Sequence, residues 1–349
     1  MTALSNKITN VFTSAVYIKW WTEFFRLYFL TGINDKDFRD LEEIYNEARE
    51  FLPPWLYSDY GAGLFILYSR SGQYSKVIEV ASKIYKIVQK VNNLHSLAWI
   101  KRTLGDAYVQ MGDILKGKRL IEEALKINRE IDDPTCLALC LVEVGKLNYY
   151  LGKTENALDH LKEAIGLFAE EKSLMFLSPY YFFVLLLLEQ GKKTEVEKVV
   201  DTLKQRYQKF SSTNFSSFVE ALLLKYETRA TKKVMVQTKL EQLLKTPPEG
   251  KWFKQEIYFY VVIHYLDLLV HEFNEFQEQE VLEEISTILD ETKKLAKRYC
   301  QTNFLVQFSI IEAKLFLIQD KFQEAHELLE TLVQRASVVN IPRLKSQVE

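Results

Sequence analysis

Five glycines recur along this chain at an almost constant interval, each in a short polar break between two apolar-patterned stretches. Gly32, Gly72, Gly112, Gly152 and Gly191 are separated by 40, 40, 40 and 39 residues. A fixed period between about 20 and 50 residues is typical of supersecondary units that repeat and stack on their neighbours. The sequence therefore predicts a solenoid, whose extended surface suits a protein that binds a partner.

The segment after each break has the pattern of an amphipathic helix. Counted from each glycine, and from Thr231 and Asp320 at equivalent places further on, the ninth and twelfth residues are always apolar. The fifth residue is mostly small or β-branched. Offsets of 5, 9 and 12, as at Gly117, Ile121 and Ala124, fall on one face of a helix with about 3.6 residues per turn.

The segment before each break is also predicted to be helical. Four positions upstream of the break stand the aromatic residues Tyr28, Tyr68, Tyr108 and Phe316. Seven positions upstream stand the small residues Gly105, Gly145 and Ala313, where two helices have room to approach closely. The repeating unit is therefore helix, tight turn, helix, with glycine ending the first helix.

One further unit is predicted between the last two breaks. The interval from Thr231 to Asp320 is 89 residues, which leaves room for one more pair of helices and about nine extra residues. We expect these helices near Trp252–Phe273 and Gln277–Tyr299, after the strongest helix-breaking segment of the chain, Pro247–Gly250.

The pattern predicts a single domain. No linker rich in proline, glycine or serine divides the 349 residues, and stacked repeats need none because each buries its inner face on its neighbours. We predict an all-α solenoid of about eight helix-turn-helix repeats over residues 1–349. Its repeats are degenerate at the N-terminus and around residues 251–300. Residues 339–349 are expected to form a C-terminal cap or a truncated repeat.

Charge and cysteine content argue against several classes of protein. A net charge of −2 gives no general attraction for nucleic acid or an anionic membrane, so neither is expected as a partner. Three cysteines do not form a disulfide framework, and their odd number suits a reducing cytosol, so we predict a cytoplasmic protein. The longest apolar run, Tyr180–Leu188, has nine residues, whereas a membrane span needs about 20.

Three stretches resemble the tetratricopeptide repeat. They are Leu104–Tyr108 followed by Gly117 and Ala124, Gly145 followed by Leu151–Leu158 and Ala164, and Lys321–Leu329. The 40-residue spacing exceeds the usual length of about 34 residues. It is similar to the long-helix variants of MalT-like regulators, kinesin light chains and bacterial Rap-type or quorum-sensing regulators. The resemblance implies a right-handed superhelix whose first helices line a concave groove for peptides or partner helices.

In that architecture, the residue six positions before each break faces the groove. These positions carry Arg26, Ile66, Asp106, Lys146, Leu185, Lys225 and Lys314. Arg102 lies one helical turn before Asp106. Four of the seven column residues are basic, which favours an acidic peptide or a carboxylate held by charge-assisted hydrogen bonds. The alternative is an ordinary solvated helix face.

Aromatic residues offer a second candidate surface. They crowd the segments Trp20–Phe29, Tyr149–Tyr150 and Tyr180–Phe183. Consecutive residues of a helix point about 100° apart, so not all of these rings can face one core, and some are expected in the groove or on a partner. The alternative is that long helices are buried on several sides. The candidate partner-binding residues are therefore Arg26, Arg102, Asp106, Lys146, Tyr149, Lys225 and Lys314.

The sequence shows no motif for catalysis or metal binding. The segment His326-Glu-Leu-Leu-Glu330 resembles a zinc-protease helix but has glutamate where the second histidine ligand must stand. Cys136 and Cys140 lie four residues apart on a predicted helix, where buried thiols act as small hydrophobic groups. A metal site would need more ligands close by. We therefore predict that the chain is not an enzyme and has no cofactor and no metal.

Two functions fit these features. The first is a scaffold or adaptor that binds a protein or peptide through the concave surface. The alternative is the sensor region of a larger signalling protein, such as a STAND ATPase or a CHAT caspase-like protease, whose catalytic part lies outside this chain.

Overall fold

The structure is a computed structural model that describes residues 15, 18–24, 35–51, 54–131, 133–168, 177–207, 214–225, 230–245 and 255–339. Within these residues the secondary structure is helical, with no strand. The predicted break at Gly32, the candidate residue Arg26, the segment Pro247–Gly250 and residues 340–349 lie outside the described residues. The all-α class predicted from the sequence is confirmed.

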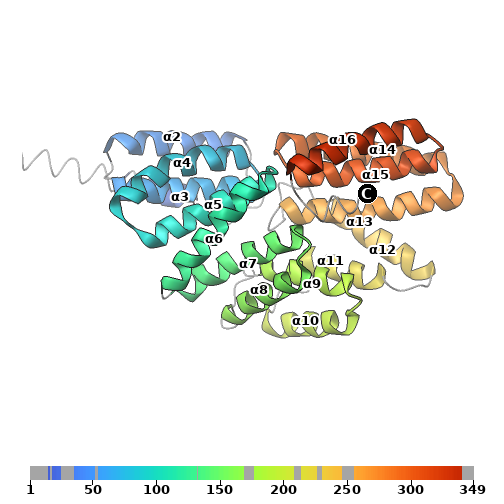
Figure 1. Ribbon diagram of the computed structural model, residues 1–349, viewed down its shortest axis with the longest axis horizontal. Helices are drawn as coiled ribbons and strands as arrows, with labels where there is room; N and C mark the ends of the chain where they lie inside the picture. Colours follow the sequence, from blue (N-terminus) through green and yellow to red (C-terminus); the bar gives the residue numbers. More distant parts are fainter. Residues whose placement is uncertain are drawn as a thin grey trace, which may run out of the picture.

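The described helices follow one another in antiparallel pairs (Figure 1). The earlier ones are α2 (Asp35–Phe51), α3 (Pro54–Arg70), α4 (Tyr74–Val91), α5 (Leu94–Gln110), α6 (Ile114–Glu130), α7 (Pro134–Tyr150) and α8 (Thr154–Leu167). The later ones are α9 (Ser178–Glu189), α10 (Lys193–Arg206), α11 (Asn214–Lys225), α12 (Ala230–Leu244), α13 (Gln255–Phe276), α14 (Gln279–Arg298), α15 (Thr302–Ile318) and α16 (Phe322–Val339). Residues 18–24 are also helical.

The predicted corners within the pairs coincide with the turn glycines. Gly72, Gly112, Gly152 and Gly191 have φ values of 72°, 94°, 70° and 71°, in the region that only glycine adopts at low cost. At the α5–α6 corner, the Asp113 N–H donates to the Tyr108 carbonyl at 2.8 Å and the Gly112 N–H donates to Val109 at 3.1 Å. These two bonds satisfy carbonyls that the ending helix would otherwise leave without partners.

The two predicted breaks without glycine differ. Asp320 adopts a φ of 59°, and the Lys321 N–H donates to the Phe316 carbonyl at 2.9 Å, so a corner forms there as predicted. Thr231 lies inside α12, so the prediction of a break at this residue is wrong. A β-branched residue strongly disfavours the left-handed conformation, and the backbone at Thr231 stays helical. The predicted apolar face of α12 is nevertheless buried at Val236, Leu240 and Leu243.

The additional unit between these breaks is present. α13 and α14 occupy Gln255–Phe276 and Gln279–Arg298, close to the predicted ranges. Their corner is at Gln277, which has a φ of 56° and whose N–H donates to the Phe273 carbonyl at 2.8 Å. Both helices of this unit are longer than the 17 residues of α5, α6 and α7, since α13 has 22 residues and α14 has 20.

Small residues allow the paired helices to pack closely in the middle of the chain. A Cβ atom added to Gly105 would lie 2.6 Å from Ile121 Cγ1 and 2.9 Å from the Gly117 carbonyl oxygen. A Cβ atom added to Gly145 would lie 2.7 Å from Leu161 Cγ. All three distances are shorter than a van der Waals contact, so both positions need a small residue, as the spacing predicted.

Many of the crowded aromatic residues lie in the core. Tyr149, Tyr150 and all of residues 180–183 are buried. The ring of Tyr181 lies 5.2 Å from that of Tyr260, which lies 5.1 Å from that of Phe304. One aromatic cluster thus connects α9, α13 and α15, because the array curves and brings distant first helices together.

The curvature also brings the beginning of α15 against the end of α5. In Figure 1 the pairs follow an arc, with α2–α5 and α13–α16 at its two ends and α7–α12 below them. The Thr302 hydroxyl donates to the Met111 carbonyl at 3.1 Å, and the Asn303 amide donates to the Val109 carbonyl at 3.4 Å. These bonds join segments more than half the chain apart, and no sequence period predicted them.

Candidate partner-binding surface

The first helices of the pairs form a continuous layer. Adjacent first helices contact one another from α3 through α5, α7 and α9 to α11, and again between α13 and α15. An ion pair between Lys225 and Asp267 joins α11 to α13. The second helices α4, α6, α8, α12 and α14 each pack on their own first helix and on the next one in the chain. Residues on neighbouring first helices can therefore lie side by side, and the predicted column of charged residues runs along this layer.

In α5 and α7 the column residues pair with each other. Asp106 and Lys146 occupy the same position in adjacent repeats, and the Lys146 ammonium contacts the Asp106 carboxylate directly. It also lies 3.0 Å from the Glu143 carboxylate, which in turn lies 3.8 Å from the Arg102 guanidinium. The Lys146 side chain is only 2% exposed. This cluster is a buried ion-pair network within the inner layer.

The expected exposed location of these residues is therefore corrected. Asp106 and Lys146 are buried because opposite charges at one position of neighbouring repeats meet and neutralise each other. The Arg102 side chain is mostly buried and lies over the Trp99 ring, 5.5 Å from its centre. Tyr149 is buried in the aromatic cluster, and its hydroxyl donates to Glu189 at 3.4 Å. Opposite charges exactly one repeat apart were the sequence signal for this network.

In α11, α13 and α15 the column residues keep exposed surface. The Lys225 ammonium lies 3.4 Å from Asp267 Oδ2 and 3.3 Å from His264 Nδ1. Lys314 Nζ lies 3.8 Å from the other oxygen of Asp267. The side chains of Lys225 and Lys314 are 25% and 55% exposed. We call Lys225, His264, Asp267 and Lys314 the inner polar group.

The sequence predicted Lys225 and Lys314 but missed the two residues between them. His264 and Asp267 lie on α13, in the unit between Thr231 and Asp320. No break was predicted within that unit, so no column residue was predicted there. Burial and the neighbouring Lys225 ammonium lower the pKa of His264 to about 3. The imidazole is therefore neutral near pH 7. The group then has two cations and one anion.

Apart from His264, the cysteines and histidines lie outside the inner polar group. Cys140 is buried, and burial raises its pKa to about 11. His326 pairs on the exposed face of α16 with Glu330 at 3.3 Å. A cluster of His95, Asp133 and Cys136 lies at the beginning of α5 and α7. The sequence analysis did not predict that His95 lies beside Cys136, because the two residues belong to different repeats.

Part of the chain matches a known repeat family. Residues 96–170, from α5 into the segment after α8, match a family model of the tetratricopeptide repeat. These residues are therefore tetratricopeptide repeats, and the resemblance predicted from the sequence is confirmed. No curated protein matches the chain.

Solved structures show similarity in fold over most of the chain. A Rap protein complexed with competence and sporulation factor is similar over 96% of this chain and 95% of its own, with a TM-score of 0.55 and 11% identity. The Rap conjugation gene regulator of the plasmid pLS20, in complex with a Phr peptide, is similar over 97% of this chain and 98% of its own, with a TM-score of 0.54 and 11% identity. The chain thus has the α-solenoid fold of these proteins.

None of the described helices has the length and apolar composition needed to cross a membrane.

Proposed function

We propose that the chain binds a peptide, or an extended segment of a partner protein, along its inner layer at the inner polar group. One observation carries this proposal: Lys225, Asp267 and Lys314 form a line of charges across three neighbouring first helices and retain exposed surface. Similarity in fold to Rap proteins in complex with peptides supports the same class of partner. Tetratricopeptide repeats over residues 96–170 support it as well.

An acidic partner suits the inner polar group. Two lysines surround one aspartate, and His264 is neutral near pH 7 because of its lowered pKa, so the net local charge is positive. An exposed ion pair such as Lys314–Asp267, at 3.8 Å, contributes only about 0–1 kcal/mol. A carboxylate of the partner therefore competes for Lys314 at little cost.

The test reverses the charge of the two lysines of the inner polar group. A control variant reverses the charge of two exposed lysines elsewhere. The variant Lys225→Glu with Lys314→Glu alters the inner polar group, and Lys162→Glu with Lys198→Glu alters exposed positions on the second helices α8 and α10. Partners captured from native lysate by the wild-type chain are identified by mass spectrometry. A synthetic peptide covering the bound segment is then titrated by fluorescence anisotropy.

We expect the inner double variant to bind the peptide at least about tenfold more weakly, and the outer double variant to bind as wild type does. Wild-type affinity should also fall as salt screens the charges. Equal losses in both variants, or no loss in either, would contradict the proposal.

A regulatory outcome of binding is supported by one of the similar structures, which is a conjugation gene regulator. The alternative of a sensor region in a larger signalling protein, such as a STAND ATPase or a CHAT protease, stays a prediction. Both alternatives use the same inner layer, so the peptide titration applies to either.

A further inference from the structure

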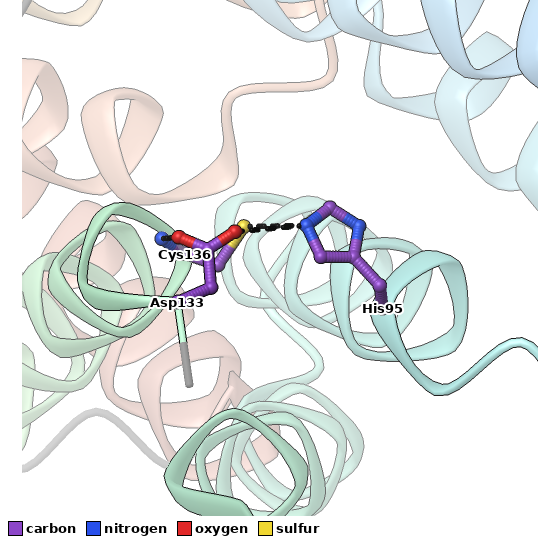
Figure 2. A group of neighbouring side chains, drawn as sticks. All are labelled: His95, Asp133 and Cys136. Atoms are coloured by element: carbon purple, nitrogen blue, oxygen red, sulfur yellow. Dashed lines mark hydrogen bonds and ion pairs between the residues drawn. The ribbon is translucent and has the colours of Figure 1, made fainter. Parts of the chain in front are cut away.

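Three side chains with different donor atoms meet where α5 and α7 begin (Figure 2). His95 is in the first turn of α5, Asp133 precedes α7, and Cys136 is in the first turn of α7. His95 Nε2 lies 3.1 Å from Asp133 Oδ2 and 3.1 Å from Cys136 Sγ. All three donor atoms lie within 4.8 Å of one another.

The local structure holds the carboxylate in place. Asp133 is the N-cap of α7, and its Oδ1 accepts a hydrogen bond from the Cys136 N–H at 2.9 Å. Its other oxygen, Oδ2, faces His95. A ligand carboxylate whose second oxygen is already hydrogen-bonded is oriented in this way at many metal sites.

The three side chains hydrogen-bond one another, and the Cys136 thiol also bonds the Asp133 carboxylate. A single ring nitrogen, Nε2, faces both a carboxylate oxygen and a thiol at 3.1 Å. That nitrogen carries either a proton, which it donates to the carboxylate, or a lone pair, which accepts from the thiol. It cannot serve both neighbours fully at once. A cation between the three atoms would accept electron density from nitrogen, oxygen and sulfur together.

We propose that His95, Asp133 and Cys136 bind a divalent cation of the zinc class. Imidazole nitrogen, thiolate sulfur and carboxylate oxygen are the ligands that Zn²⁺ takes, whereas Mg²⁺ and Ca²⁺ prefer oxygen alone. Zinc bonds of about 2.0–2.3 Å in a tetrahedral arrangement separate the donor atoms by about 3.4–3.6 Å. The observed separations of 3.1 Å need only a small outward rotation of the side chains.

The fourth position of the metal faces solvent. The side chains of His95 and Asp133 are 46% and 31% exposed, so a water molecule or an external ligand can complete the coordination. The three ligands come from adjacent repeats, since His95 precedes Asp133 by 38 residues and Cys136 by 41. The metal would therefore join the first helices of neighbouring repeats at their N-terminal ends.

The test uses the full chain with Zn²⁺ and Co²⁺ as probes. Zn²⁺ affinity and stoichiometry are measured by competition with a chelating indicator, and Co²⁺ reports the thiolate ligand through sulfur-to-cobalt charge-transfer absorption. The ligand variants are Cys136→Ser, His95→Gln and Asp133→Asn. Asparagine caps a helix about as well as aspartate, so Asp133→Asn removes the ligand charge and keeps the cap. The controls are Cys300→Ser and His160→Gln, at positions outside the cluster.

We expect one metal per chain and an affinity that falls about 100-fold or more in each ligand variant, beyond the 10–100-fold that loss of an outer-shell partner causes. The charge-transfer band should disappear in Cys136→Ser and persist in both controls. Zn²⁺ should raise the melting temperature of the wild type and of both controls, and not that of the ligand variants. Absence of metal binding in the wild type, or equal losses in ligand and control variants, would overturn the proposal. Melting curves without metal identify any variant that fails to fold.

Discussion

Residues 94–168 and residues 214–318 both form helix pairs, but the two regions differ in how closely their helices pack and in whether their column charges are buried. In the first region, α5–α8, glycines lie in the helix interfaces and the column charges are buried as an ion-pair network. In the second, α11–α15, the sequence has no glycine in any helix, and the column charges keep exposed surface. Only the first region matches the tetratricopeptide-repeat model.

The comparison shows that a place in the predicted column does not decide the role of a charged residue. The sequence placed Lys146 and Lys225 in the same column, but Lys146 neutralises two buried carboxylates, whereas Lys225 is the last residue of α11 and borders solvent. Burying an ion pair seldom adds stability by itself, although breaking one leaves an unpaired charge in the core. Lys146 therefore serves the fold, and Lys225 remains available to a partner.

The largest expected effect tests this difference directly. Lys146→Ala should lower the free energy of unfolding by about 3–5 kcal/mol, because Asp106 and Glu143 would be left buried without their cation. Lys225→Ala should cost only about 0–1 kcal/mol, as for an exposed pair. Urea denaturation of both variants measures the two values. Similar costs would show that burial does not separate the two regions.

A smaller effect tests the close packing of the first region. Gly105→Ala should cost about 1–3 kcal/mol, because the new methyl group would lie 2.9 Å from the Gly117 carbonyl oxygen, which cannot move without shifting α6. Gly166→Ala in α8 is the control, since nothing lies within 4 Å of its added Cβ. It should be neutral or stabilise by up to about 1 kcal/mol. A harmless Gly105→Ala would mean that α5 and α6 do not need glycine to pack.

The pH dependence of stability tests the second region. The pKa of His264 is about 3 in the folded chain and about 6.5 when unfolded, so between these values only the unfolded state binds the proton. Stability should therefore fall as the pH drops below 6.5, by about 1 kcal/mol at pH 5.5 from this residue. His264→Gln should lose less stability than wild type between pH 7.5 and 5.5. Parallel curves would argue that His264 is not desolvated beside Lys225.

The weakest expected effect tests the contact between the two ends of the arc. Thr302→Val removes the hydroxyl that donates to the Met111 carbonyl and should cost about 0.5–1.5 kcal/mol. Thr331→Val is the control, because Thr331 bonds only within its own helix, to Glu327 at 2.9 Å. Hydrogen exchange at the end of α5 should accelerate in Thr302→Val and not in the control. Equal exchange would mean that α15 does not restrain α5.

Local sequence patterns predicted the fold well at positions where the backbone conformation strongly favours one residue type. Glycine is the residue that adopts positive φ cheaply, so the four described glycine corners were readable. The break predicted at Thr231 was wrong because the spacing of apolar residues identifies the buried face of a helix but not the residue at which the helix begins. The inner surface was predicted only in part. Asp106 and Lys146 lie on the first helices as expected, but their burial depends on how closely two neighbouring first helices approach.

The order of apolar and small residues by itself determined that this chain forms stacked helix pairs, because helical periodicity and turn glycines act over a few neighbouring residues. Only the tertiary structure decided which charges are exposed, which rings meet across the arc, and that His95 lies beside Cys136. Those contacts depend on the spacing and curvature of neighbouring repeats, which are set by packing summed over the whole array.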